Sequence, residues 1–348
     1  METLRPGTVV GGDFELVRPL GEGGMSVVWL ARDLALGRDV ALKLMTPPEG
    51  ASAERMRRRL RREAHILAVA EHPSILPVYR RGEDEATGLS FYAMKACLVS
   101  GAEMRRLCAD VFGCALPRNP ERWDAAPRAL SLADLLEGGK ALPQGAVARF
   151  GEDLAEAVAA AHAMSPPVVH RDIKPSNVLF DHDGRAMLAD FGIASRLHDD
   201  PADRSVDTFD DTTSTHGRRG FVGTADYAAP EQRQGDPASP AMDWWSLGAV
   251  LFETLTGERP RGLEVPSEFD PKRISRRWDP LLKGMLATRP ERRTADPGAI
   301  IAALRSLQSS RRERTLQWGL AALHAFGGLL FFLAMLFWLL VKLKSGGA

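Results

Sequence analysis

A glycine-rich turn provides the first residues whose types and spacing could do chemistry. Residues 21–28 read Gly-Glu-Gly-Gly-Met-Ser-Val-Val and lie between two strand-like stretches. Glycines let such a turn approach a ligand closely, so that backbone N–H groups can reach phosphate oxygens. A glycine-rich hairpin is more often structural, however, and no helix opens directly after this one, so the dinucleotide-binding form of the motif fails. The turn alone is a weak indication of phosphate binding.

Lys43 is the second candidate, because it alternates with apolar residues in the strand-like run Val40–Leu44. These neighbours predict a sheltered position, where an ammonium group needs an anionic partner. Glu63 is the natural candidate, since it lies beside the apolar stripe of a predicted helix, three residues after Leu60 and four before Leu67. A pair between Lys43 and Glu63 would aim the ammonium group at nucleotide phosphates.

Three short motifs follow in order along the chain. Residues 170–177 read His-Arg-Asp-Ile-Lys-Pro-Ser-Asn, residues 190–192 read Asp-Phe-Gly, and residues 229–231 read Ala-Pro-Glu. Each tripeptide occurs by chance in many proteins. Their joint order and spacing, with the glycine turn and Lys43 upstream, do not occur by chance in many proteins. This combination is therefore the strongest signal in the sequence.

The elements that must position these residues fall into two groups. Strand patterns come first, together with one helical pattern, and mostly helical patterns follow from about Leu130 onward. We therefore expect an α+β fold with a small strand-rich lobe and a larger helical lobe. The predicted strands lie within 13–45, 75–79 and 89–94, and the predicted helices at 54–70, 144–164, 244–255 and 300–307. Two stretches fit neither lobe: 99–128, with weak periodicity, and 198–215, whose Asp, Ser and Thr content is typical of a mobile loop.

Composition limits the partners and the compartment. Lys+Arg and Asp+Glu number 45 each, so the overall charge points to no nucleic-acid partner. The three cysteines lack CxxC spacing, which argues against a disulfide framework or a zinc site and favours a reducing compartment. The N-terminal residues contain no apolar stretch typical of a signal peptide.

The segment Leu316–Val341 departs from the pattern of a water-soluble domain, because its 26 residues include no Asp, Glu, Lys or Arg. A bilayer core needs about 20 apolar residues in a helix, and Trp318 and Trp338 stand near the two ends, where aromatic residues favour the membrane interface. The alternative is a buried core helix, but such helices are seldom this long or apolar all round. We expect one transmembrane helix, with the pair Ala321 and Ala325 as a weak indication of a homodimer.

The motifs together resemble those of the eukaryotic-like (Hanks-type) serine/threonine protein kinases of bacteria. The stretches LGEGGMSVVWLARD, EHPSILPVY and GTADYAAPEQ are typical of that branch. The resemblance implies a bilobal protein-kinase fold and transfer of phosphate from ATP to protein substrates. Because ATP is cytoplasmic, and three arginines precede the hydrophobic segment against two lysines after it, the kinase domain is expected in the cytoplasm. The implied organisation is a kinase domain at 14–307 with lobes at 14–95 and 96–307, an insertion at about 99–128, a juxtamembrane linker at 308–315, a single helix at 316–341 in the inner membrane and a short tail at 342–348.

The resemblance also assigns roles to individual positions. Asp172 would orient the substrate hydroxyl and accept its proton, while Lys174 would offset charge on the transferring phosphate. Asn177 and Asp190 would hold Mg²⁺ or Mn²⁺. Lys43, held by Glu63, would contact the α- and β-phosphates of ATP. The other residues expected around ATP are Leu20, Gly21, Glu22, Gly23, Gly24, Met25, Ser26 (in place of the usual third glycine), Val27, Val28 and Ala41, with Met94 as gatekeeper and the backbone of Lys95 and Cys97 as the hinge.

Further positions would control or stabilise such an enzyme. Arg171 would bind a phosphate on the activation segment; its candidate autophosphorylation sites include Thr212, Thr213, Ser214 and Thr215. Acidic residues in the same segment would either offer carboxylates to Arg171 or be solvated filler. Thr224, expected beside Asp172 and Lys174, implies serine or threonine substrates. Glu231 and Arg293 would form a purely structural ion pair.

Two alternatives keep a kinase-like fold but change the function. A pseudokinase scaffold is disfavoured, because Lys43, Glu63, Asp172, Asn177 and Asp190 are all present. A small-molecule kinase is disfavoured, because residues 223–231 resemble the peptide-docking segment of protein kinases. We expect the insertion near the mouth of the ATP site. A structural role for its Cys108 and Cys114 is favoured over a redox or metal-binding one.

Overall fold

The computed structural model describes residues 4–23, 26–45, 71–84, 87–165, 167–191, 226–261 and 265–308. Within these ranges no helix is long and apolar enough to cross a membrane. The predicted helix at 54–70 and the hydrophobic segment 316–341 lie outside the described residues. So do several candidate site residues, namely Gly24, Met25, Glu63, Thr212, Thr213, Ser214, Thr215 and Thr224.

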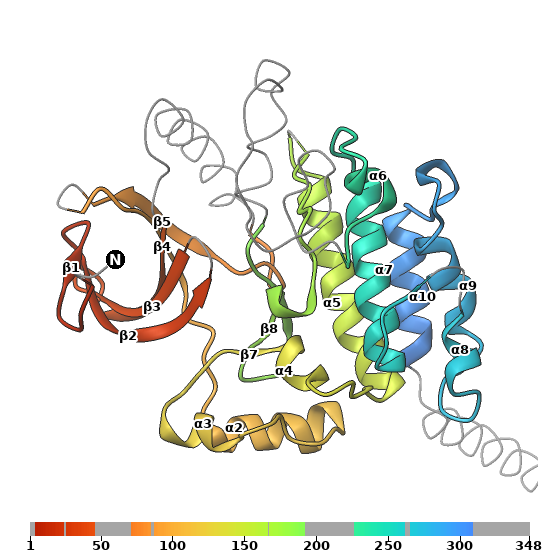
Figure 1. The fold of residues 1–348 in the computed structure, drawn as a ribbon, viewed down its shortest axis with the longest axis horizontal. Helices are drawn as coiled ribbons and strands as arrows, with labels where there is room; N and C mark the ends of the chain where they lie inside the picture. Colours follow the sequence, from red (N-terminus) through yellow and green to blue (C-terminus); the bar gives the residue numbers. More distant parts are fainter. Residues whose placement is uncertain are drawn as a thin grey trace, which may run out of the picture.

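The N-terminal lobe is built on an antiparallel sheet of six strands in the order β1-β2-β3-β4-β6-β5 (Figure 1). Sequential strands pair directly from β1 to β4, while β6 inserts between β4 and β5. The strands predicted within residues 13–45 are therefore confirmed. The bounds are β1 Val9–Val10, β2 Phe14–Gly23, β3 Ser26–Asp33, β4 Arg38–Met45, β5 Val78–Glu83 and β6 Ser90–Lys95.

The two faces of this sheet carry different kinds of side chain. Successive side chains of a strand point to opposite faces. One face buries an apolar cluster that includes Phe14, Trp29, Leu42 and Phe91. The opposite face carries Lys43, with Val28 directly opposite it on β3. Because a register shift of one residue would exchange the two faces, the apolar cluster also fixes the direction of the Lys43 side chain.

The C-terminal lobe is mostly helical. Its three longest helices, α5, α7 and α10, run side by side (Figure 1). Helix α7 is buried along nearly its whole length, including Trp244, Leu247 and Phe252. The bounds are β7 Leu130–Ser131, α4 Leu132–Leu136, α5 Gln144–His162, η2 Pro175–Asn177, β8 Val178–Phe180, β9 Ala186–Leu188, α6 Pro230–Arg233, α7 Pro240–Thr256, α8 Pro266–Phe269, α9 Trp278–Met285, η5 Pro290–Arg292 and α10 Pro297–Gln308.

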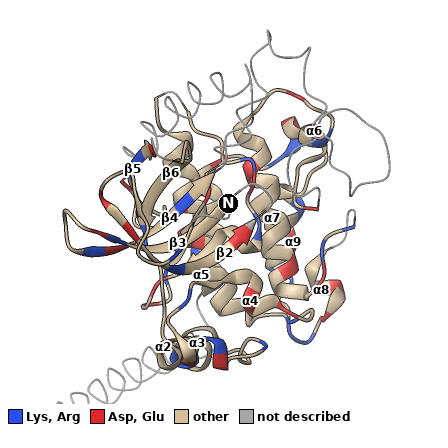
Figure 2. Ribbon diagram, turned by 60° about the vertical axis from the view of Figure 1, so that its left-hand side comes forward, with Lys and Arg blue, Asp and Glu red and all other residues tan. Residues whose placement is uncertain are grey.

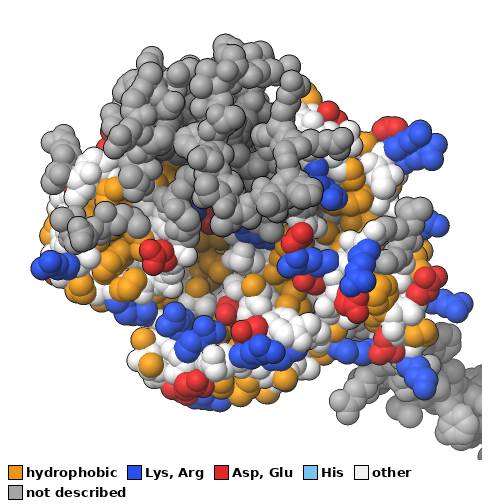
Figure 3. Space-filling model, viewed as in Figure 1, with side chains coloured by type: hydrophobic (Ala, Val, Ile, Leu, Met, Phe, Trp, Pro, Cys, Tyr) orange, Lys and Arg blue, Asp and Glu red, His pale blue; other side chains and the backbone are white. Residues whose placement is uncertain are grey.

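Charged residues of both signs are distributed over both lobes in the described part of the chain (Figure 2). On the face shown in Figure 3 the surface is hollowed between the lobes, and hydrophobic side chains are visible in the hollow. On the Lys43 face of the sheet, Ala41 and Met94 cluster with Met187 of β9, and Leu179 of β8 packs against this cluster.

Residues 99–128, whose pattern fitted neither lobe and which we expected as an insertion within residues 96–307, contain regular helices. This segment forms α2 Gly101–Arg106, the π-helical turn η1 Leu107–Phe112 and α3 Glu121–Ala125. Its largest apolar side chains, Met104, Leu107, Phe112 and Trp123, are each at most 2 % exposed and join the core of the C-terminal lobe. Helices this short do not repeat long enough to give a clear period in the sequence, which is why the segment shows only weak periodicity.

The expected location of this segment near the mouth of the predicted ATP site stays a prediction. Helices α2 and α3 lie below α4 in Figure 1, on the outer side of the C-terminal lobe. The end of the segment meets the sheet, where the Arg18 guanidinium of β2 donates to the carbonyl of Pro127. The segment is closed at its base, because Val99 and Arg128 exchange two backbone hydrogen bonds of 2.8 and 3.0 Å.

Cys108 and Cys114 lie together at the end of η1. The amide N–H of Cys114 donates to the carbonyl of Cys108 at 2.8 Å, and the two thiols share a hydrogen bond. That bond raises the pKa of Cys108 and lowers the pKa of Cys114. Both thiols are free, and Cys108 is fully buried in the core of the lobe.

Candidate active site

A lysine and an aspartate face one another between the lobes. The Nζ atom of Lys43 on β4 lies 2.8 Å from Oδ1 of Asp190, directly after β9. Their side chains are 18 % and 39 % exposed, so the pair is sheltered and still reachable from solvent. Asp190 has a φ of 56°, a left-handed conformation that is uncommon for a residue with a side chain. Lys43 therefore has an acidic partner from the opposite lobe, while its predicted partner, Glu63, lies outside the described residues.

A second group of polar residues surrounds Asp172 in the loop before β8. The Lys174 ammonium lies 2.8 Å from Oδ2 of Asp172. The side-chain amide of Asn177 donates to the same oxygen at 3.1 Å and to the Asp172 backbone carbonyl at 2.8 Å. The structure thus brings together three residues that the sequence singled out. Because the Asn177 amide nitrogen is engaged, its oxygen is the atom left to face a cation.

The backbone before Asp172 is held by Asp243, a residue that the sequence reasoning missed. Its carboxylate accepts from the amides of His170 and Arg171, both at 2.7 Å, and from the His162 ring at 2.8 Å. Arg171 needs this support because its φ of 67° is unfavourable for a residue with a side chain. The available sequence signal is an aspartate within the largely apolar run 242–252, and the structure leaves Asp243 1 % exposed there.

His170 connects this loop to the strand that carries Asp190. Burial lowers the pKa of its imidazole, so the ring is neutral. Its Nδ1 accepts from the amide of Asp172 at 3.2 Å, so the proton resides on Nε2, which donates to the carbonyl of Ala189 at 3.0 Å. The ring also lies 4.5 Å from that of Phe191. The neutral imidazole of His170 thereby fixes the backbone at Asp172 and next to Asp190.

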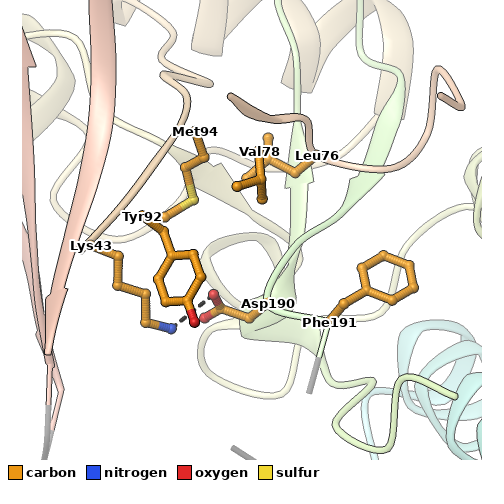
Figure 4. Close-up of a pocket in the computed structure, with 7 residues that line it drawn as sticks. All are labelled: Lys43, Leu76, Val78, Tyr92, Met94, Asp190 and Phe191. Carbon is orange, nitrogen blue, oxygen red and sulfur yellow. Dashed lines mark ion pairs between the residues drawn. The ribbon is translucent and has the colours of Figure 1, made fainter. Parts of the chain in front are cut away.

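An apolar pocket lies beside the Lys43–Asp190 pair. It is lined by Lys43, Leu76, Val78, Tyr92, Met94, Asp190 and Phe191 (Figure 4). The neighbouring cluster contains the predicted residues Ala41, Met94 and Cys97, with Leu20 and Val28 packed against it. A lining of this composition suits a ligand with a flat apolar ring. The polar groups of the pocket are concentrated at its end near Lys43.

The segment after β6 closes this apolar cluster. The amide of Lys95 donates to the carbonyl of Pro77 at 3.0 Å. The Cys97 thiol lies 3.3 Å from the carbonyl of Phe180, and burial raises its pKa to about 11. Cys97 is therefore a protonated, unreactive thiol that packs the hinge against β8. Of the predicted glycine turn, Gly21, Glu22, Gly23, Ser26 and Val27 lie on the paired ends of β2 and β3.

Glu231 and Arg293 form a buried pair far from the pocket. The two guanidinium nitrogens of Arg293 reach the two carboxylate oxygens at 2.6 and 3.1 Å. Arg293 also donates to the carbonyls of Ala241 and Ala287, and its guanidinium lies over the ring of Trp245. The pair joins α6 to α7 and to the segment before α10.

Comparisons with known proteins agree with this geometry. The family model described as "Protein kinase domain" matches residues 125–302, more than half of the chain. Serine/threonine-protein kinase PrkC of Bacillus subtilis is 30% identical over 280 residues, which cover 79% of this chain and 36% of the relative. Serine/threonine-protein kinase PknB of Mycobacterium leprae is 32% identical over 249 residues, covering 71% of this chain and 33% of the relative. The chain thus spans about a third of the length of these curated relatives.

A solved structure shows the same fold. The kinase domain of Mycobacterium tuberculosis PknI aligns with a TM-score of 0.58 and 25% sequence identity, over 88% of this chain and 100% of that one. Fold, motifs and paired side chains therefore lead to one assignment. The chain belongs to the protein kinase family, in the group of bacterial Hanks-type serine/threonine protein kinases.

Proposed function

We propose that this protein is a serine/threonine protein kinase that transfers the γ-phosphate of ATP to serine and threonine hydroxyls of proteins. One observation carries the proposal: Asp172 is held between Lys174 and Asn177, at 2.8 and 3.1 Å. A carboxylate held beside a cation and an amide can bind a hydroxyl group and accept its proton. Both contacts use Oδ2 of Asp172, and we assign Oδ1 to the substrate hydroxyl.

Lys174 and Lys43 supply the positive charge that the reaction needs. Phosphoryl transfer depends mainly on positioning and on electrostatic stabilisation of the phosphate oxygens. Lys174 lies beside the base and would offset charge on the transferring group. Lys43 is paired with Asp190 at 2.8 Å. We infer that it exchanges this partner for nucleotide phosphates when ATP binds.

Asn177 and Asp190 fit a divalent metal ion. Mg²⁺ binds oxygen atoms, usually from one or two carboxylates together with substrate phosphates and water, and carboxylate and carbonyl oxygens suit Mn²⁺ as well. Asp190 carries one carboxylate oxygen beyond the one that Lys43 contacts, and Asn177 presents its amide oxygen because its nitrogen binds Asp172. When bound, the metal neutralises charge between the β- and γ-phosphates.

Control of the enzyme is proposed on sequence grounds. Lys174 stands two residues after the base, the spacing of serine/threonine kinases, and Thr224 belongs to the same pattern. We propose autophosphorylation among residues 212–215, with Arg171 as the group that binds the phosphate. Arg171 is half-buried beside Asp172 in the folded chain, which is where such a group would act.

Membrane anchoring is a separate proposal. The 26 uncharged residues Leu316–Val341 support a single helix in the inner membrane, with the kinase domain on the cytoplasmic side. The helix would act as a tether and as a surface for a homodimer. Fractionation of cells that produce the full chain tests this: we expect it in the membrane, and release into the soluble fraction by carbonate wash would refute it.

Transfer of radiolabel from ATP, with Mg²⁺, to the protein itself and to a generic protein substrate tests the enzymatic proposal. We expect label on serine and threonine in the wild type and its loss in Asp172→Ala. Asp183→Ala is the matched control, since that carboxylate is exposed on the turn after β8. Nucleotide binding without transfer by the wild type would instead identify a pseudokinase scaffold.

A further inference from the structure

Tyr92 occupies the centre of a row of side chains on the pocket face of the sheet. It lies directly opposite Lys43 on β4 and directly opposite Arg81 on β5. Residues opposite one another on neighbouring strands have Cβ atoms about 5 Å apart and point to the same face. The ring of Tyr92 is therefore flanked by one cationic residue on each side. Its side chain is 1 % exposed, so the row is sheltered from solvent.

The hydroxyl end of this ring reaches the end of the pocket where the Lys43–Asp190 pair lies. Figure 4 shows the ring extending from β6 toward this ion pair, and all three residues line the same pocket. On the other side, the Arg81 guanidinium carbon is 5.8 Å from the ring centroid, within the range of a cation–π contact. The ring is thus fixed in place, with its hydroxyl end in the same pocket as the Lys43–Asp190 pair.

The hydroxyl group is what distinguishes Tyr92 from a phenylalanine at this position. A buried hydroxyl costs free energy unless it is hydrogen-bonded, and phenylalanine would fill the same volume without that cost. A phenol is both donor and acceptor, so it can accept from an ammonium group while donating to a carboxylate. Beside Lys43 and Asp190 this dual capacity is useful, because both are charged and both must be directed toward a ligand.

We propose that Tyr92 is a positioning residue for Lys43: its hydroxyl holds the ammonium group at the phosphate end of the pocket. Lys43 has a flexible four-carbon stem, and a fixed neutral partner limits its rotamers without adding a competing charge. Tyr92 would offer this partner when Asp190 turns to a metal ion. This inference rests on the proposed function for the identity of the ligand, ATP with Mg²⁺.

The test is a double-mutant cycle on nucleotide binding in the full chain. Dissociation constants of ATP with Mg²⁺ are measured by calorimetry for wild type, Tyr92→Phe, Lys43→Met and the double variant. We expect Tyr92→Phe to weaken binding roughly tenfold, the size of one hydrogen bond to a charged group. In the Lys43→Met background the same change should have an effect below about twofold, because the group being positioned is gone.

Two further readouts separate positioning from packing. Tyr92→Phe keeps the ring, so its unfolding midpoint should match that of the wild type, and its KM for ATP should rise with little change in kcat. Tyr79→Phe is the matched control, because Tyr79 lies on β5 with 40 % of its surface exposed. It should leave binding unchanged.

Three results would overturn the inference. They are wild-type affinity in Tyr92→Phe, an equal loss of affinity in the Lys43→Met background, or a loss of affinity explained by a lower unfolding midpoint. If the wild type binds ATP but transfers no phosphate, only the proposed kinase activity fails. If the wild type binds no ATP, both fail.

Discussion

Replacement of Asp243 by asparagine should detach the backbone of the loop that carries Asp172 from helix α7. The carboxylate accepts three hydrogen bonds, from the amides of His170 and Arg171 and from the ring of His162, at 2.7 to 2.8 Å. Asparagine has the same shape but only one accepting oxygen. Its oxygen can replace only one of the two carboxylate oxygens, so its NH₂ group must face at least one backbone amide N–H.

The magnitude follows from these contacts. A hydrogen bond to a charged group contributes about 1.5–3 kcal/mol and a neutral one about 0.5–1.5, so two retained bonds lose roughly 2 kcal/mol together. The third bond is lost and leaves a buried amide without a partner, which costs about 1–3 kcal/mol more. The free energy of unfolding should therefore fall by about 3–5 kcal/mol. For a domain of this size, that lowers the melting temperature by on the order of 10 °C.

Activity should fall as well, because Arg171 holds its unfavourable φ of 67° through this contact. Once released, it can relax and move Asp172, and a misplacement of about 1 Å can cost a hundredfold in rate. Chemical denaturation and initial rates at saturating ATP measure the two effects. Asp236→Asn, at an exposed position after α6, is the matched control and should change stability by less than about 0.5 kcal/mol. An Asp243→Asn protein with the wild-type midpoint and rate would refute the argument.

Three further outcomes are expected. Arg293→Met should lower the free energy of unfolding by about 3–5 kcal/mol, because it leaves the Glu231 carboxylate buried without its cation; adding Glu231→Leu should recover part of that loss in denaturation curves, and an additive loss would count against the pairing. Trp123→Ala should cost about 3–5 kcal/mol, because this ring is 2 % exposed in the large core; a change below 1 kcal/mol would mean that the 99–128 segment is not part of that core. Burial raises the pKa of Cys97 to about 11 from 9.0, so the folded state resists ionisation. The stability of the wild type relative to Cys97→Ala should hold below pH 9 and fall by about 2–3 kcal/mol between pH 9 and 11, a trend that pH-dependent denaturation would contradict if it were flat.

The sequence predicted the lobes and the polar motifs well, and the reason is local. Lys43 stands in a strand whose alternation fixes its face, and Asp172, Lys174 and Asn177 fall within six residues of chain. Their side chains meet because one short loop and η2 carry all three. Such arrangements depend on few long-range contacts, so residue type and spacing describe them adequately.

Residues whose role depends on distant partners were not found. Asp243 acts on His170 across 73 positions of the chain, and only the packing of α7 reveals this contact. In the sequence, Tyr92 looks like an ordinary apolar strand residue. Only the strand register shows that it lies opposite Lys43. The 99–128 segment was missed for another reason, since its elements are too short for a periodic signal and its core partners lie elsewhere.

The bridge between Val99 and Arg128 has a consequence for how this kinase domain can vary. The two ends of the segment are as close as the ends of a tight turn, so the hinge before it and α4 after it need not move when the enclosed chain changes length. The bridge therefore closes the segment at its base whatever the length of the enclosed chain. We therefore expect that it can be exchanged as a unit, provided that the replacement covers the apolar surface now filled by Phe112 and Trp123.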